Sequence, residues 1–116
     1  MTTELVSGPA ILVGYAYALQ LAAETPLFPE AARFAGQLRH VLSDPEPITT
    51  LTSVSGGLVR ISDTVLEVRL APEITSRLVP GSVLLDLVRT DLAPPQHLAL
   101  FLELPVLLPV TRDLSP

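Results

Sequence analysis

The 116-residue sequence contains no cysteine, lysine, asparagine or tryptophan. Without cysteine, the chain can form neither a disulfide framework nor a thiolate metal site. Without lysine, its seven basic residues are all arginines, which are spread from Arg33 to Arg112 and give a net charge of −5. Because binding to a phosphate backbone requires clustered positive charge, the sequence predicts no nucleic-acid partner.

Motifs for catalysis and cofactor binding are also lacking. The Gly56-Gly57 pair has no following lysine to hold a phosphate, and no serine lies in a nucleophile elbow. His40 and His97 occupy separate segments, without the converging ligands that zinc requires. We therefore predict no metal site, no cofactor and no enzymatic activity.

One group of neighbouring residues contains the three residue types of a catalytic triad. His40, Ser43 and Asp44 lie within five residues of one another at the start of a proline-rich loop. The residues of a triad normally come from segments that are distant in the sequence, so this group is weak evidence for a catalytic site. A small hydrolase is therefore the weakest of the three functional hypotheses; the other two are given at the end of this subsection.

What the chain has in abundance is apolar side chains. Hydrophobic residues make up 48% of the sequence, and the mean hydropathy is +0.50. This exceeds what a small soluble monomer needs for its core, so we expect an apolar partner surface. The uncharged run over residues 5–23 has no preceding basic residue and is diluted by glycine, proline, tyrosine and glutamine, which predicts neither a signal peptide nor a membrane span.

The periodicity of these apolar residues is that of β-strands. Alternating or β-branched runs separated by Pro, Gly, Ser and Asp predict seven or eight short strands. The expected strands cover residues 15–22, 32–39, 48–54, 58–61, 64–70, 82–90, 98–104 and 106–108.

The stretch from Leu66 to Asp91 is the best marked of these regions. It predicts two strands that form a hairpin-like unit, with one helical turn beginning at Pro72 and a tight turn at Pro80-Gly81 between them. The second strand is apolar on both faces, as is typical of a central strand. The three strands from residue 48 to residue 70 follow one another as an expected meander.

These patterns together predict an all-β fold, an antiparallel two-sheet Ig-like β-sandwich of seven or eight strands with one short helical turn. We expect one domain over residues 10–112, an N-terminal arm over residues 1–9 and a C-terminal tail over residues 113–116.

Asp86 interrupts the apolar pattern of the strand over residues 82–90. A buried carboxylate without a partner costs several kcal/mol, so we expect Asp86 at a solvated or hydrogen-bonded edge of the sheet. Acid chemistry normally requires a second titrating group, which favours a structural role.

Both ends of the domain carry aliphatic residues beside prolines. Pro105 and Pro109 bracket residues 106–108, which we expect to form an edge strand or an extended arm, since proline cannot donate to a strand ladder. The predicted partner interface consists of Leu5, Val6, Ile11, Leu12, Val106, Leu107, Leu108 and Val110.

Short motifs along residues 15–112 resemble those of small Ig-like structural proteins of tailed bacteriophages, similar to the N-terminal domain of upper-baseplate proteins. The motifs that carry the resemblance are Phe34-Ala35-Gly36-Gln37-Leu38-Arg39, Leu66-Glu67-Val68-Arg69-Leu70, Thr75, Pro80-Gly81, Leu84-Leu85-Asp86-Leu87 and Pro109-Val110-Thr111-Arg112.

The resemblance implies a virion component that is made in the bacterial host cytoplasm and acts through assembly. Expected partners are other virion proteins and copies of the same chain, with no membrane partner. A tail or baseplate location follows from the resemblance, with capsid decoration or a head-to-tail junction as alternatives. The second functional hypothesis is a carbohydrate- or surface-binding β-sandwich module.

Overall fold

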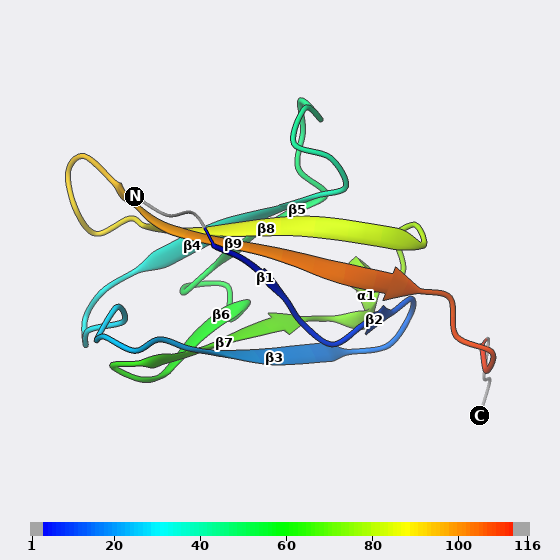
Figure 1. Ribbon diagram of the computed structural model, residues 1–116, viewed down its shortest axis with the longest axis horizontal. Coiled ribbons are helices and arrows are strands. Elements are labelled where there is room, and N and C mark those ends of the chain that lie inside the picture. Colours follow the sequence, from blue (N-terminus) through cyan, green and yellow to red (C-terminus); the bar gives the residue numbers. More distant parts are fainter. Residues whose placement is uncertain (1–3, 113–116) are drawn as a thin grey trace.

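The computed structural model describes the chain over residues 4–112, and its side chains from residue 8 onward. In that part the chain forms nine strands and one short helix, so the all-β expectation is confirmed (Figure 1). The elements are β1 (Glu4–Ser7), β2 (Ile11–Leu12), β3 (Tyr17–Ala22), β4 (Phe34–Arg39), β5 (Thr49–Thr52), β6 (Leu58–Ser62), β7 (Val65–Leu70), α1 (Pro72–Thr75), β8 (Gly81–Arg89) and β9 (Gln96–Leu107).

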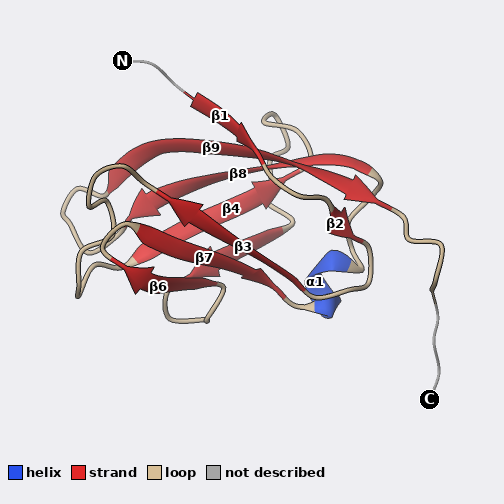
Figure 2. Cartoon of the chain, turned by 60° about the horizontal axis from the view of Figure 1, so that its bottom comes forward, coloured by secondary structure: helices blue, strands red, loops and turns tan. Residues whose placement is uncertain are grey.

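The strands form two sheets that pack face to face (Figures 1 and 2). The large sheet has the order β1-β9-β8-β4-β5, and β2 also pairs with β9. The small sheet has the order β3-β7-β6. Neighbouring strands are antiparallel except for β1 and β2, which run parallel to β9.

Alternating side chains from the two sheets form one core. On β8, for example, Val83, Leu85 and Leu87 point inward and are at most 2% exposed. Phe28 and Phe34 pack edge to face, with ring centroids 5.5 Å apart. The buried hydrophobic residues are Ile11, Phe28, Phe34, Leu38, Leu51, Leu58, Leu66, Val68, Leu70, Leu78, Val83, Leu85, Leu87, Leu102, Leu104 and Val106.

The link between β7 and β8 has the local structure that the sequence indicates. The helical turn begins at Pro72, and Gly81 adopts the positive φ of +138° that makes glycine useful after Pro80. Thr75 of α1 is fully buried, and its hydroxyl donates to the Tyr15 carbonyl at 2.9 Å. This bond fastens α1 to the segment that enters β3.

The predicted hairpin-like unit is nevertheless wrong as a pairing. β7 lies in the small sheet and β8 lies in the large sheet, so α1 and the Pro80-Gly81 turn carry the chain from one layer to the other. The predicted meander is wrong for the same reason, because β5 pairs with β4 while β6 and β7 pair in the opposite sheet. Local turn residues indicate where the chain reverses, but the layer that receives the next strand is chosen by core packing.

The chain termini also differ from expectation. The predicted arm over residues 1–9 contains β1, which pairs with β9 from Glu4↔Leu100 to Ser7↔Glu103. The predicted break at Pro105 does not occur, because β9 runs through it to Leu107. The predicted tail over residues 113–116, like residues 1–3, lies outside the described residues.

Pro105 fits in β9 because of a gap on the neighbouring side. Ser7 is opposite Glu103 and Ile11 is opposite Val106, so neither β1 nor β2 is opposite Pro105. The Leu107 carbonyl accepts from the Val13 N–H at 3.1 Å. Residues two apart on a strand direct their backbone groups to the same side, so the missing N–H of Pro105 points into this gap and costs no ladder bond.

Candidate interaction surface

Four of the predicted interface residues lie on β2, at the end of β9 or in the three residues that follow it. Leu12 and Leu107 are register partners, and they are 40% and 52% exposed. Leu108 is 51% exposed and Val110 is 99% exposed. We call Leu12, Leu107, Leu108 and Val110 the C-terminal apolar patch; Figure 2 shows β2 beside the end of β9 and the chain leaving the sheet there.

The other four predicted residues do not contribute exposed side chains to this surface. Ile11 is 0% exposed and Val106 is 1% exposed, because both point inward between the sheets. They are core residues, and their inclusion in the interface was wrong. Leu5 and Val6 belong to β1, and their side chains lie outside the described ones.

The segment after β9 is held against the domain by a tyrosine. The Tyr15 hydroxyl donates to the Thr111 carbonyl at 2.7 Å, across 96 residues of sequence. Together with the Val13–Leu107 backbone bond, this contact holds the strand end and the following residues in place. Leu108 and Val110 are therefore presented to solvent by an anchored segment, which lowers the entropy cost of docking them against a partner.

The Asp86 carboxylate is paired with an imidazole that the sequence pattern did not indicate. His97 Nε2 lies 2.8 Å from Asp86 Oδ2 on the outer face of the large sheet. The two side chains are 40% (His97) and 37% (Asp86) exposed, and the His97 ring stacks on Phe101 at 5.1 Å. Asp86 thus lies on the central strand β8, with its charge at the exposed face rather than at a sheet edge.

An irregularity in β9 brings His97 to this position. The register shifts between Asp86↔Phe101 and Val88↔His97, and Ala99 has a φ of +57°. The Ala99 N–H donates to His97 Nδ1 at 2.8 Å. Because Nδ1 accepts this bond, the neutral ring carries its proton on Nε2 and donates it to Asp86. A bulge cannot be located from alternation alone, which explains why the pair was missed.

His40 is held in a comparable way. The Val79 N–H donates to His40 Nε2 at 3.3 Å, and His40 Nδ1 lies 3.2 Å from the Ser82 carbonyl. Since a carbonyl only accepts, Nδ1 carries the proton of the neutral ring. Asp44 instead accepts from the Val41 N–H at 3.3 Å. His40 and Asp44 of the candidate triad therefore make separate backbone contacts, and neither histidine has a ring nitrogen free to act as a base.

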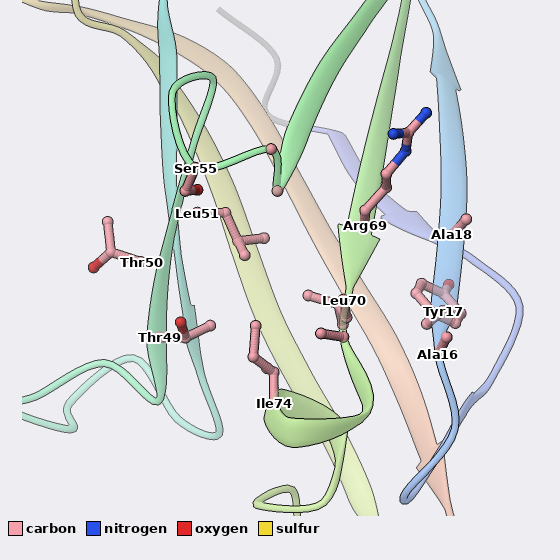
Figure 3. Close-up of a pocket in the computed structure, with 13 residues that line it drawn as sticks. Ala16, Tyr17, Ala18, Thr49, Thr50, Leu51, Ser55, Arg69, Leu70 and Ile74 are labelled. Carbon is pink, nitrogen blue, oxygen red and sulfur yellow. The ribbon is translucent and has the colours of Figure 1, made fainter.

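One hollow lies between β5 and β7, beside the loop of residues 55–57 that leads into β6 (Figure 3). It has a volume of about 580 Å³. Leu51, Leu70 and Ile74 form its apolar wall, and Figure 3 shows Arg69 extending away from Leu51 and Ile74. No carboxylate or imidazole is among the described residues that line it. The hollow has apolar surface and hydroxyl groups, but no acid–base pair.

Tyr17 also borders this hollow, and its phenol is already engaged. The hydroxyl donates to the Pro9 carbonyl at 2.7 Å, and burial raises the pKa of Tyr17 above its ordinary value. The neutral phenol is thus the stable form, which suits a hydrogen-bond donor between the β1–β2 link and β3.

Two further properties concern metal binding and membranes. Over residues 4–112, the side chains that are described include no group of three or more His, Asp or Glu positioned to bind a metal ion. Within the same part of the chain, no helix has the length and apolar character to cross a bilayer.

Comparison with known proteins adds no family assignment. No protein-family model matches the sequence, and no curated protein shows significant similarity to it.

Proposed function

We propose that this protein is a non-enzymatic structural protein of a bacteriophage virion, which acts through protein–protein contacts with copies of itself and with other virion proteins. The observation that carries the assembly function is the C-terminal apolar patch. Its leucines are about half exposed and Val110 is 99% exposed, although the domain has a complete core without them. Exposed apolar side chains grouped at one end are typical of an interaction site.

The strand order supports an Ig-like sandwich as the scaffold. In an Ig variable-type domain, one sheet contains strands G, F, C and C′, and the other contains B, E and D. The orders β9-β8-β4-β5 and β3-β7-β6 correspond to these two sets. The chain lacks the cysteine pair and the tryptophan of antibody domains, and Phe28, Phe34 and aliphatic side chains fill the core instead.

The environment of the histidines supports a function without catalysis. Both ring nitrogens of His40 and of His97 are engaged, with backbone groups and with Asp86. A general base needs a free lone pair within reach of its substrate, and neither ring offers one in this arrangement.

The placement in a virion rests on the sequence resemblance to small Ig-like phage proteins. Thr75 and Pro80-Gly81 belong to that resemblance. In the structure, the Thr75 hydroxyl anchors α1 to the Tyr15 carbonyl, and Pro80-Gly81 forms the turn into β8. A tail or baseplate location is the first proposal, with capsid decoration or a head-to-tail junction as alternatives within the same class.

A carbohydrate-binding module is the competing proposal, and the burial of two of the three phenylalanines disfavours it. Sugar platforms present exposed rings, but Phe28 and Phe34 are core residues. Tyr15 is 39% exposed, and its hydroxyl is already bonded to the Thr111 carbonyl. A glycan array that showed specific binding would favour this alternative.

The assembly function is tested by polar substitutions in the patch. We expect the wild-type protein to self-associate in sedimentation velocity, and the Leu108→Ser/Val110→Ser variant to shift towards monomer. The matched control is Leu42→Ser/Val54→Ser, which replaces the same residue types at sites that are 76% and 83% exposed elsewhere. A wild-type protein that stays monomeric at high concentration, or an equal response of both variants, would contradict a specific role for the patch.

A further inference from the structure

The outer edge of β3 is an open strand edge without the usual protection. Within residues 4–112, β3 pairs only with β7, in a regular register of six residues from Tyr17↔Leu70 to Ala22↔Val65. It contains no charged residue, proline or glycine. Proteins usually protect an edge with charge, proline, a bulge or a very short strand, because an unprotected edge can pair with another chain.

The other single-partner strands of the described chain are shorter or protected. β1 and β5 have four residues each, and β2 has two. β6 has five residues, carries Arg60 and has a register shift after it. β3 is therefore the edge best suited to accept another strand.

The direction of the backbone groups on β3 follows from its partner strand. The Arg69 N–H donates to the Gly57 carbonyl at 2.8 Å, on the side of β7 away from β3. Arg69 is also the register partner of Ala18 on β3. Because the backbone groups of Arg69 point away from β3, Arg69 and Ala18 form a non-hydrogen-bonded pair. The N–H and C=O of Ala18 therefore point to the open edge. The Ala23 N–H donates to the Thr64 carbonyl at 2.8 Å, which fits this alternation. Gln20 and Ala22 consequently also direct their backbone groups outward.

An apolar hollow lies between this edge and the large sheet. It has a volume of about 240 Å³, which is below the roughly 300–1,000 Å³ of small-molecule sites. Leu19, Leu21, Phe28, Leu100 and Leu102 are among its lining residues. The hollow is of the size that a few aliphatic side chains of a neighbouring strand would cover.

We propose that β3 pairs with β3 of a second copy, antiparallel around Gln20, so that two small sheets join into one continuous sheet of six strands. This inference deepens the proposed assembly function and rests on it. The pairing places Gln20 opposite Gln20 and Ala18 opposite Ala22 of the second copy. No like charges meet, whereas self-pairing of β6 would bring its Arg60 near a second Arg60.

The register around Gln20 uses the open edge most fully. When Gln20 lies on the two-fold axis, the outward-pointing backbone groups of Ala18, Gln20 and Ala22 are all opposite outward-pointing backbone groups of the second copy. Pairing around Leu19 would engage only Ala18 and Gln20 among these residues. The Gln20-centred register also directs Leu19 and Leu21 of the second copy to the side on which the hollow lies.

A cross-linking experiment tests this register. Opposed residues in a hydrogen-bonded antiparallel pair have Cα atoms about 5.5 Å apart, within the roughly 4.4–6.8 Å range for disulfides. Because the chain has no cysteine, the Gln20→Cys variant can form a disulfide only between copies. We expect a covalent dimer on mild oxidation, and at least about a tenfold lower yield for Thr50→Cys on the β5 edge, since only a paired edge holds two thiols at this distance.

A charge substitution tests the same contact without cross-linking. Gln20→Lys places two ammonium groups opposite each other in the dimer and should raise its dissociation constant by about fivefold. Within one copy the new side chain lies beside Glu67, which the Gln20 amide already contacts, so we expect the thermal unfolding midpoint to be unchanged. Thr50→Lys, a matched exposed site on β5, should leave the dissociation constant unchanged.

The two interfaces can be separated by their outcomes. If the wild type associates and the Leu108→Ser/Val110→Ser variant dissociates, while Gln20→Cys forms no covalent dimer, the β3 pairing is overturned and the patch remains. If Gln20→Cys cross-links and Gln20→Lys weakens association while the patch variant behaves as wild type, the β3 pairing stands and the patch loses its role. An unchanged dissociation constant for Gln20→Lys would also overturn the β3 pairing.

Discussion

The inner and outer faces of the large sheet carry different kinds of residues on the same strands. On β8, the inward Val83, Leu85 and Leu87 are at most 2% exposed, whereas the alternate side chains are only half-buried. The outer face holds the Asp86–His97 pair, with Asp86 37% exposed. One strand thus supplies both the core and a solvent-facing surface, because successive side chains point to opposite sides. The difference predicts that equal substitutions one residue apart will have unequal effects.

The largest difference is expected between neighbouring leucines. Leu85→Ala should lower the free energy of unfolding by about 2–5 kcal/mol, because it leaves a cavity in a close-packed core. Leu84→Ala, on the half-buried outer face, should cost less than about half of that, because water can reach the vacated space. Chemical denaturation of both variants measures the contrast. Equal losses would show that the outer face is packed as tightly as the core.

The next largest effect is expected at Gly36 on β4. A Cβ at this position would lie 2.5 Å from the Asp86 carbonyl oxygen on β8. The substitution Gly36→Ala restricts the unfolded chain, which favours folding by about 0.4–1 kcal/mol. The clash involves the backbone of the central strand, so we expect a net loss of about 1–3 kcal/mol in the free energy of unfolding.

The control for Gly36→Ala is Gln37→Ala, at the next residue and on the exposed outer face. Its thermal unfolding midpoint should stay close to that of the wild type. If Gly36→Ala were as stable as the wild type, β4 and β8 would be able to separate locally without loss of packing.

A smaller effect is expected from the Asp86–His97 pair. Both side chains are more than one-third exposed, so solvent screens their interaction. A double-mutant cycle with Asp86→Ala and His97→Ala should give a coupling free energy of about 0.2–1 kcal/mol. A coupling above about 2 kcal/mol would mean that the bulge in β9 depends on this contact.

The smallest effect is expected in the acid range, at Asp91 beyond the end of β8. The Arg89 side chain, with the Arg33 backbone N–H, lowers the pKa of Asp91 from 3.8 to about 2. A lowered folded-state pKa gives stability that is present above pH 3.8 and is lost as the pH falls towards 2. Asp91→Asn should therefore flatten the decrease of the thermal midpoint over this range. An unchanged slope would show that the pair does not persist in solution.

Part of the candidate surface was predictable from the sequence. The aliphatic residues beside Pro105 and Pro109 led to Leu107, Leu108 and Val110, whose side chains are exposed in the structure, and their role in an interface stays a prediction. Ile11 and Val106 could not be distinguished from Leu12 and Leu107, because all four are aliphatic. Only the register of β2 on β9 decides which of the two pairs points inward.

The sequence by itself determined most of the strands between residues 15 and 90 and several of the places where they stop. Alternation defines β3, β7 and β8, and Pro72 and Pro80-Gly81 define α1 and the turn, because each of these signals acts over a few residues. The tertiary structure decided which sheet receives each strand, how His97 reaches Asp86 and which edge of β3 stays open. These features depend on contacts between residues far apart in the chain, and periodicity carries no information about such partners.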